Sequence, residues 1–211
     1  MNELPGPEAR AGSAVAELPE RGERERALIM RAAHRLIGRD GGGSTSVEDI
    51  LREAGVNRRV FYCHFRSKDT LVLAMQHEAG ELVRQGLQAA VDGADDGRTA
   101  VVAWIEKFLS IGWEEPRARE GRTFMAPEVG LVAGIAEALE DIYARHRAIL
   151  VDALARGRAD GSLPGAEPER DAFAIHAVTL RCVEMRGRRR LDRPYTAVRD
   201  EFVRLFVPLA L

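Results

Sequence analysis

The sequence predicts an all-α protein of about nine helices, in which a small N-terminal helical unit is followed by a larger helical bundle. Apolar residues recur at helical spacing almost throughout from about residue 23, and no stretch alternates apolar and polar residues as a strand would. The chain has 211 residues, of which 45% are hydrophobic, so it can bury a substantial core.

The first two helices are defined by their apolar stripes and by the signals between them. Glycines 41–43 are expected to end the first helix, and Thr45 with Glu48 to form a capping box that begins the second. Gly55 is expected to end the second helix. The stripes comprise Leu28, Ile29, Ala32, Ala33, Leu36 and Ile37 in the first helix and Val47, Ile50, Leu51 and Ala54 in the second.

Two further caps predict the third and fourth helices. Asn57 can cap a short third helix that runs to about Phe65, and Ser67 can cap a long fourth helix. Residues 21–66 are therefore expected to form one domain and residues 67–211 a second one. Residues 1–20 contain three prolines and no apolar run, and they are expected to form a disordered tail without a signal peptide.

Four more helices are expected in the second domain. The loop at 92–98 precedes a fifth helix that Pro116 ends, and a long helix with apolar residues from Leu131 to Ala153 follows Pro127. The last two helices are expected at roughly 168–187 and after the LDRP segment at 191–194.

The charge is unevenly distributed along the chain, although its formal total is only -2. Residues 21–70 carry eleven basic and seven acidic side chains, a net charge of +4, whereas residues 1–20 and 71–211 each carry -3. A local positive charge suits a polyanionic partner. Two distant cysteines, Cys63 and Cys182, favour neither disulfides nor a zinc module, and no apolar run is long enough to span a membrane. A cytoplasmic protein is expected.

The stretch AGVNRRVFYCHFRSKDTL, residues 54–71, carries the most information about function. At about 100° per residue, Arg58, Arg59 and Tyr62 share one face of the third helix, whereas residues 60, 61, 64 and 65 share the other. The first face can enter a DNA major groove, where arginine binds guanine or phosphate, or it can be an ordinary charged surface. Lys68 opposes the dipole of the fourth helix, so it either binds an anion or extends into water.

Together with RAAHRLIGRDG before it, the segment TSVEDILREAGVNRRVFYCHFRSKDTL resembles the N-terminal domain of the TetR family of bacterial transcriptional regulators. The resemblance covers residues 24 to about 75 and implies a helix-turn-helix unit whose third helix enters the major groove. It implies DNA contacts, to bases or backbone, by Thr45, Ser46, Asn57, Arg58, Arg59, Val60, Tyr62, His64 and Lys68. Because His64 falls on the packed side of the helix, its phosphate contact is the weakest of these expectations.

The resemblance also implies a homodimer and a small-molecule pocket in the second domain. The apolar stripe of the last helix independently fits an interface, with Val198, Phe202, Leu205, Phe206 and Leu209 as its candidates. Candidates for the pocket, each of which also suits core packing, are Trp104, Phe108, Trp113, Phe124, Met125, Tyr143, Phe173 and His176.

The expected function is that of a ligand-responsive repressor, which binds a palindromic operator as a homodimer and is released by a small molecule. No catalytic or metal-binding constellation is found: HEAGE at 77–81 lacks a second histidine, and no P-loop occurs. No cofactor is expected. Two alternatives stay open: a helical enzyme or small-molecule carrier that does not use its helix-turn-helix on DNA, and a helix-turn-helix protein that acts through protein contacts.

Overall fold

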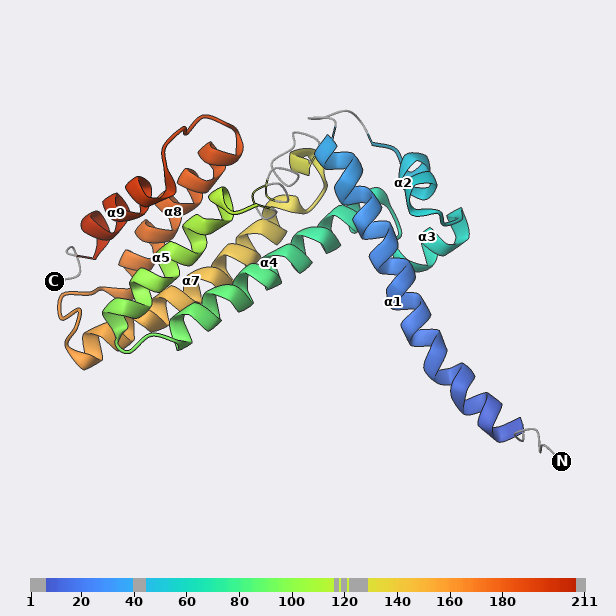
Figure 1. The fold of residues 1–211 in the computed structure, drawn as a ribbon, viewed down its shortest axis with the longest axis horizontal. Helices are drawn as coiled ribbons and strands as arrows, with labels where there is room; N and C mark the ends of the chain where they lie inside the picture. The colour runs from blue at the N-terminus through green and yellow to red at the C-terminus, as the bar shows by residue number, and fades with distance from the viewer. Residues whose placement is uncertain (1–6, 40–44, 116–117, 119–120, 122–128, 208–211) are drawn as a thin grey trace. The chain divides into compact units, whose positions relative to one another are not determined.

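The computed structural model describes residues 7–39, 45–115, 118, 121 and 129–207. Among these residues it contains eight α-helices, one short 3-10 helix and no strand, which confirms the all-α prediction (Figure 1). The chain forms two compact units, Met1–Leu71 and Val72–Leu211. The division falls one turn inside the fourth helix, whereas the sequence placed it just before that helix.

The first unit contains helices α1 (Pro7–Arg39), α2 (Val47–Ala54) and α3 (Arg58–His64). α1 packs against both shorter helices. The apolar stripes predicted from the sequence supply its core, in which Ile29, Ile50 and Phe61 are fully buried. An ion pair of 2.7 Å between Arg35 and Glu53 also joins α1 to α2.

The start of α1 differs from the expectation for the N-terminus. The structure begins this helix at Pro7, whereas residues 1–20 were expected to form a disordered tail. Alanine and glutamate, which favour helices, recur between residues 8 and 20, and a proline such as Pro7 is tolerated in the first helical turn.

The second unit contains α4 (Lys68–Asp92) from Val72 onward, α5 (Gly97–Trp113), η1 (Val129–Leu131), α7 (Ile135–Asp160), α8 (Pro168–Gly187) and α9 (Tyr195–Phe206). α5 packs against α7, α8 and α9, and α7 packs against α8. The core between them includes Trp104, Ile105, Leu109, Leu150, Leu154 and Leu163, all fully buried.

The long helix α7 starts later than the sequence suggested. Leu131, which was assigned to its apolar face, lies in η1 and is 86% exposed. Gly134 precedes α7 with a left-handed φ of 80°, a conformation that interrupts a right-handed helix. The other predicted boundaries, at 168–187 and after the LDRP segment, agree with α8 and α9.

Candidate nucleic-acid interface

Three capping interactions fix the helix-turn-helix segment of the first unit. Ser46 caps α2, since its Oγ accepts from the Asp49 N–H at 3.1 Å and the Asp49 carboxylate accepts from the Ser46 N–H. The predicted capping box of Thr45 and Glu48 is therefore wrong by one residue, because Thr45 is buried at 7% exposure. Asn57 caps α3 as predicted, with its Oδ1 3.0 Å from the Val60 nitrogen. Gly55 ends α2 at φ 68°, a conformation open to glycine and costly for other residues.

Helix α3 has one buried face and one exposed face, as its sequence predicted. Phe61 and Phe65 point into the first unit, at 0% and 4% exposure. Arg58, Arg59 and Tyr62 are exposed on the other face, which we call the α3 outer face. This face presents two guanidinium groups and a phenol to solvent, while Phe61 and Phe65 on the opposite face pack into the core of the first unit.

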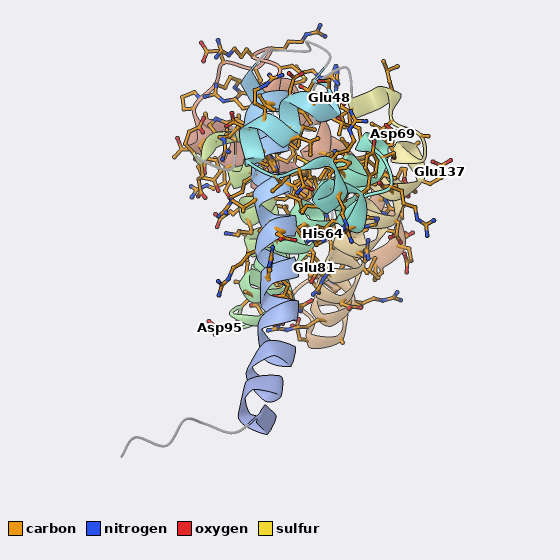
Figure 2. The ribbon with its side chains drawn as sticks, turned by 90° about the vertical axis from the view of Figure 1, so that its right-hand side faces the viewer. Glu48, His64, Asp69, Glu81, Asp95 and Glu137 are labelled. Atoms are coloured by element: carbon orange, nitrogen blue, oxygen red, sulfur yellow. The ribbon has the colours of Figure 1, made fainter. Side chains whose placement is uncertain are left out.

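The two arginines of the α3 outer face have different surroundings. Glu48 lies in the first turn of α2 (Figure 2). Its carboxylate pairs with the Arg58 guanidinium. In the part of the chain that the structure describes, no ion pair is found for Arg59. Sequence reasoning used Glu48 only as a capping residue and missed this pair, which joins positions ten residues apart on different helices.

His64, expected to touch the DNA backbone, lies on the packed side of α3. Its Nε2 is 3.4 Å from Oε2 of Glu25 on α1, and its side chain is 17% exposed. Hydrogen bonds from Arg21 and then from His64 hold the pKa of Glu25 below its usual value. A phosphate contact by His64 would have to compete with this carboxylate.

The first turn of α4 is capped as predicted. Oγ of Ser67 accepts from the Thr70 N–H at 3.2 Å, and Thr70 Oγ1 accepts from the Ser67 N–H at 3.0 Å. Lys68 is the first residue of α4 and is partly exposed. The start of a helix carries N–H groups and positive dipole character, which favour the binding of anions.

A second cluster of functional side chains lies inside the second unit, between α5, α7 and α8. The rings of Trp104 and Phe108 stack at 4.9 Å, and the His176 ring lies 5.4 Å from Phe108 and 5.4 Å from Tyr143. His146 lies 6.0 Å from Phe108. We call these five residues the ring cluster. Of the eight pocket candidates, it unites Trp104, Phe108, Tyr143 and His176.

Both histidines of the ring cluster are buried, at 3% exposure for His176 and 4% for His146. Burial lowers the pKa of His176 to about 4 and also lowers that of His146, so both are neutral at pH 7. Nε2 of His146 lies 2.9 Å from the Gly80 carbonyl, so it carries the proton, and Nδ1 is an acceptor. Within the described residues, Nδ1 of His146 and Nε2 of His176 are buried without a hydrogen-bond partner.

The other pocket candidates lie outside the ring cluster. Trp113 donates to the Arg193 carbonyl at 3.0 Å, and its ring lies under Arg186. Phe173 is 64% exposed and is not part of the ring cluster; an apolar residue near His176 on one helix can still face outward. Phe124 and Met125 lie outside the described residues. His146, a ring-cluster member, was not among the pocket candidates predicted from the sequence.

The interface candidates on α9 fall into residues that are buried within the unit and residues that are exposed. Val198 and Phe202 are buried in the core of their own unit, so the stripe that contains them covers the bundle rather than a partner. Phe206 is partly buried against the same core, Leu205 is 53% exposed, and Leu209 lies outside the described residues. On α8, the exposed side chains of Ala174, Ala177 and Val178 form an apolar patch that sequence reasoning missed.

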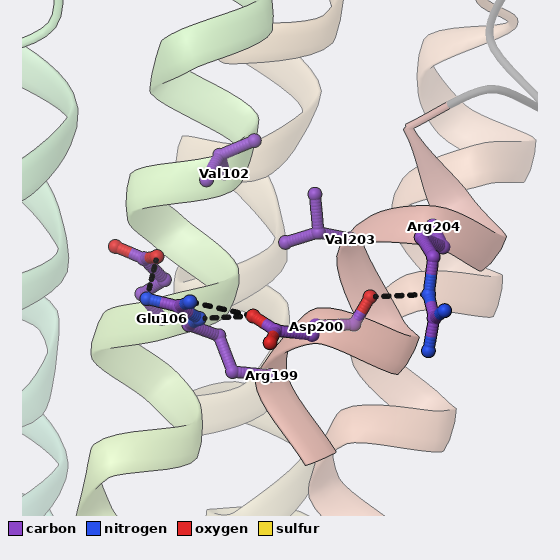
Figure 3. Close-up of a pocket in the computed structure, with 6 residues that line it drawn as sticks. All are labelled: Val102, Glu106, Arg199, Asp200, Val203 and Arg204. Atoms are coloured by element: carbon purple, nitrogen blue, oxygen red, sulfur yellow. Dashed lines mark hydrogen bonds and ion pairs between the residues drawn. The ribbon is translucent and has the colours of Figure 1, made fainter. Parts of the chain in front are cut away.

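An open groove of about 520 Å³ lies between α5 and α9 (Figure 3). Arg199 on its wall pairs with Asp200 at 2.5 Å and with Glu106 at 3.5 Å, and the Asp200 carboxylate raises the pKa of the guanidinium. The charges of Arg199, Asp200 and Glu106 in this groove therefore satisfy one another. Its residues are Val102, Glu106, Arg199, Asp200, Val203 and Arg204.

The described residues contain no group of three or more His, Cys, Asp or Glu side chains that could hold a metal ion. Among the helices searched, none has both the length and the apolar character needed to cross a membrane.

Comparison with known proteins decides the nature of the first unit. Residues 29–75 match the model of bacterial regulatory proteins of the tetR family. This segment, which we call the TetR-family segment, is similar to that family. It includes all of α2 and α3 and the start of α4, so the TetR-family segment contains both the α3 outer face and Lys68.

One curated relative matches part of the chain. An uncharacterized HTH-type transcriptional regulator of Haemophilus influenzae is 32% identical over 84 residues, which make up 40% of this chain and 41% of that protein. The chain thus spans less than half the length of this curated relative.

Solved structures share the fold over most of the chain. The fatty acid degradation regulator FadR from Bacillus halodurans has a TM-score of 0.73 at 14% identity, covering 87% of this chain and 94% of its own. AibR, solved in complex with isovaleryl coenzyme A and operator DNA, has a TM-score of 0.65 at 18% identity, covering 88% and 98%. At these identities the likeness shows the fold alone.

Proposed function

We propose that the protein is a DNA-binding transcriptional regulator, which represses transcription by binding a palindromic operator as a homodimer. The observation that carries the proposal is the α3 outer face: Arg58, Arg59 and Tyr62 are exposed on a capped helix within the TetR-family segment. Arginine can form two parallel hydrogen bonds with guanine O6 and N7 in the major groove, and it also binds phosphate. A bacterial operator as partner implies a cytoplasmic protein, and the proposal includes no enzymatic reaction.

The contacts to the DNA backbone extend from α3 to its neighbours. Ser46 at the start of α2 and Lys68 at the start of α4 are both positioned by helix caps, which fix where their polar groups point. We assign them to phosphates, together with Asn57 and Tyr62. Thr45 is buried and His64 is engaged by Glu25, so both contribute less.

A homodimer would present two copies of α3 to successive turns of one DNA face, about 34–36 Å apart. Apolar patches on the surface support self-association, since monomers seldom expose contiguous apolar area without a partner. We propose that the interface uses the exposed residues of α8 and α9, namely Ala174, Ala177, Val178 and Leu205.

We also propose that a small molecule bound near the ring cluster releases the DNA. Two buried ring nitrogens without partners support this location, because buried polar atoms are normally hydrogen-bonded. AibR is an example of the same fold that holds both a small molecule and operator DNA. A hundredfold loss of DNA affinity on binding the effector corresponds to about 2.7 kcal/mol of coupling between the two sites.

Selection from a random duplex library tests the function and identifies the preferred DNA sequence in the same experiment. The full-length protein should enrich an inverted repeat, and a variant carrying Arg58→Ala and Arg59→Ala should enrich none. Both arginines are exposed, so this variant should keep the fold, which circular dichroism can verify. If the wild type enriches no sequence, the protein belongs with the alternatives: an enzyme, a carrier or a protein that acts through protein contacts.

A further inference from the structure

The pair between Glu48 and Arg58 joins the two helices of the helix-turn-helix at their exposed surface. Glu48 is the second residue of α2 and Arg58 is the first residue of α3. Their side chains are 54% and 62% exposed, so the pair faces solvent. Each backbone is fixed beside a cap, at Ser46 for α2 and at Asn57 for α3.

The pair contributes little to folding, since exposed ion pairs are weak and the Arg35–Glu53 contact already joins α2 to the first unit. Its effect is on the Arg58 side chain, which would otherwise sample many rotamers. Glu48 accepts from NH2 of the guanidinium. A guanidinium has five N–H groups, so the others stay available in a fixed orientation.

We propose that Glu48 is a positioning residue for DNA recognition: it orients Arg58 toward one base pair and so makes Arg58 the base-reading arginine. This inference rests on the proposed function. A guanidinium held by a carboxylate loses less rotamer entropy when it binds a base edge than a free one does. The same carboxylate also disfavours the rotamers in which the guanidinium would bind a phosphate instead. Arg59 has no such carboxylate within the described residues, so it is the natural comparison.

Glu48 has a second, opposite effect, because its negative charge repels the DNA phosphates. Removing the carboxylate should therefore raise affinity for all sequences while it lowers discrimination at the base pair that Arg58 contacts. The two effects can be measured separately. The charge of Glu48 changes the affinity for every duplex by the same factor, whereas the orientation of Arg58 changes discrimination at one base pair.

The experiment measures the dissociation constants of the full-length protein for its selected duplex and for duplexes altered at one base pair at a time. The proteins are the wild type, Glu48→Ala, Arg58→Ala and the double variant. We expect Glu48→Ala and Arg58→Ala to lose discrimination at the same base pair, by roughly three- to tenfold for Glu48→Ala. In the double variant, discrimination should equal that of Arg58→Ala alone.

Two further variants separate orientation from charge. Glu48→Gln keeps an acceptor oxygen and should retain part of the discrimination. Glu23→Gln removes an exposed carboxylate of α1 in the same unit, and it should change the dissociation constants for all duplexes by one common factor. In an Arg59→Ala background, loss of Glu48 should still have its full effect.

The inference is overturned if Glu48→Ala changes the dissociation constants for all duplexes by the same factor. It is also overturned if Glu48→Ala lowers discrimination as much in the Arg58→Ala background as in the wild type. In either case the wild type still binds its selected sequence, so the proposed function stands. A wild type that selects no sequence overturns the function and the inference together.

Discussion

At the scale of single residues, we propose different kinds of DNA contact for Lys68 and for the arginines of α3. Lys68 lies in the capped first turn of α4, and its proposed partner is a phosphate rather than a base edge. Lys68→Ala should therefore weaken binding to all sequences by a similar factor and reduce the salt slope of log K by about one.

Anisotropy titrations over a range of salt concentrations check this prediction. The matched control is Arg158→Ala, which removes one exposed positive charge near the end of α7. It should leave the slope unchanged. A change of base preference in Lys68→Ala would contradict a phosphate role.

His176 predicts a dependence of stability on pH. Burial lowers its pKa to about 4, with the positive charge of Arg147 and the neighbouring His146 acting in the same direction and Glu140 opposing them. In the unfolded chain the pKa is near 6.5, so between pH 6.5 and 4 the unfolded state binds more protons. Stability should thus fall as the pH falls through this window, by at most about 1.4 kcal/mol per pH unit from this residue.

Urea denaturation of the wild type and of His176→Gln measures this contribution. Glutamine cannot titrate, so the difference between the two proteins should narrow as the pH falls from 6.5 to 4. A constant difference would show that His176 is not the group that titrates. His146 has a lowered pKa as well, and it titrates in both proteins.

At the scale of elements, the backbones of α5 and α7 approach each other closely at Gly97 and Gly157. A Cβ placed on Gly97 would lie 2.1 Å from the Cα of Gly157, and the Gly97 N–H donates to the Asp160 carboxylate at 2.8 Å. The backbones cannot separate without breaking this contact. Gly97→Ala should therefore lower the free energy of unfolding by at least about 3 kcal/mol.

The control for Gly97→Ala is Gly130→Ala, since a Cβ at Gly130 meets open space. Its midpoint of urea denaturation should match that of the wild type. Equal stability of Gly97→Ala and the wild type would mean that α5 and α7 do not meet at this point.

Elements and caps were largely predictable, because they follow from local signals. Asn57, Ser67 and the two faces of α3 were found from side-chain type and from a 100° period alone. The capping box at Ser46 was misplaced by one residue, since Thr45 and Ser46 have equally suitable hydroxyls and only burial of Thr45 distinguishes them.

Contacts between elements could not be predicted in the same way. The Glu48–Arg58 pair depends on the angle at which α2 and α3 meet, and the ring cluster depends on how α5, α7 and α8 pack. An apolar stripe predicts that one face of a helix is buried, but it does not identify whether the same chain or a partner buries it. For this reason Val198 and Phe202 were assigned to a partner although they pack on their own bundle.

At the scale of the whole molecule, the proposed homodimer depends on the exposed apolar patch of α8. Val178→Asp should place a charge in the interface and raise the dissociation constant of the dimer by at least about tenfold. Leu82→Asp, which changes an apolar residue on α4 that is even more exposed than Val178, should leave the dimer intact. Sedimentation equilibrium measures both, and a wild type with the 23.3 kDa mass of one chain would contradict the proposal.

The central claim is that the α3 outer face binds DNA, and the salt dependence of binding to the selected duplex tests it most directly. For the wild type, log K should fall steeply and linearly with log salt, and the double change of Arg58→Ala and Arg59→Ala should reduce the slope and abolish the preference for the selected sequence. An affinity that does not change with salt, or a double variant that binds like the wild type, would contradict the account.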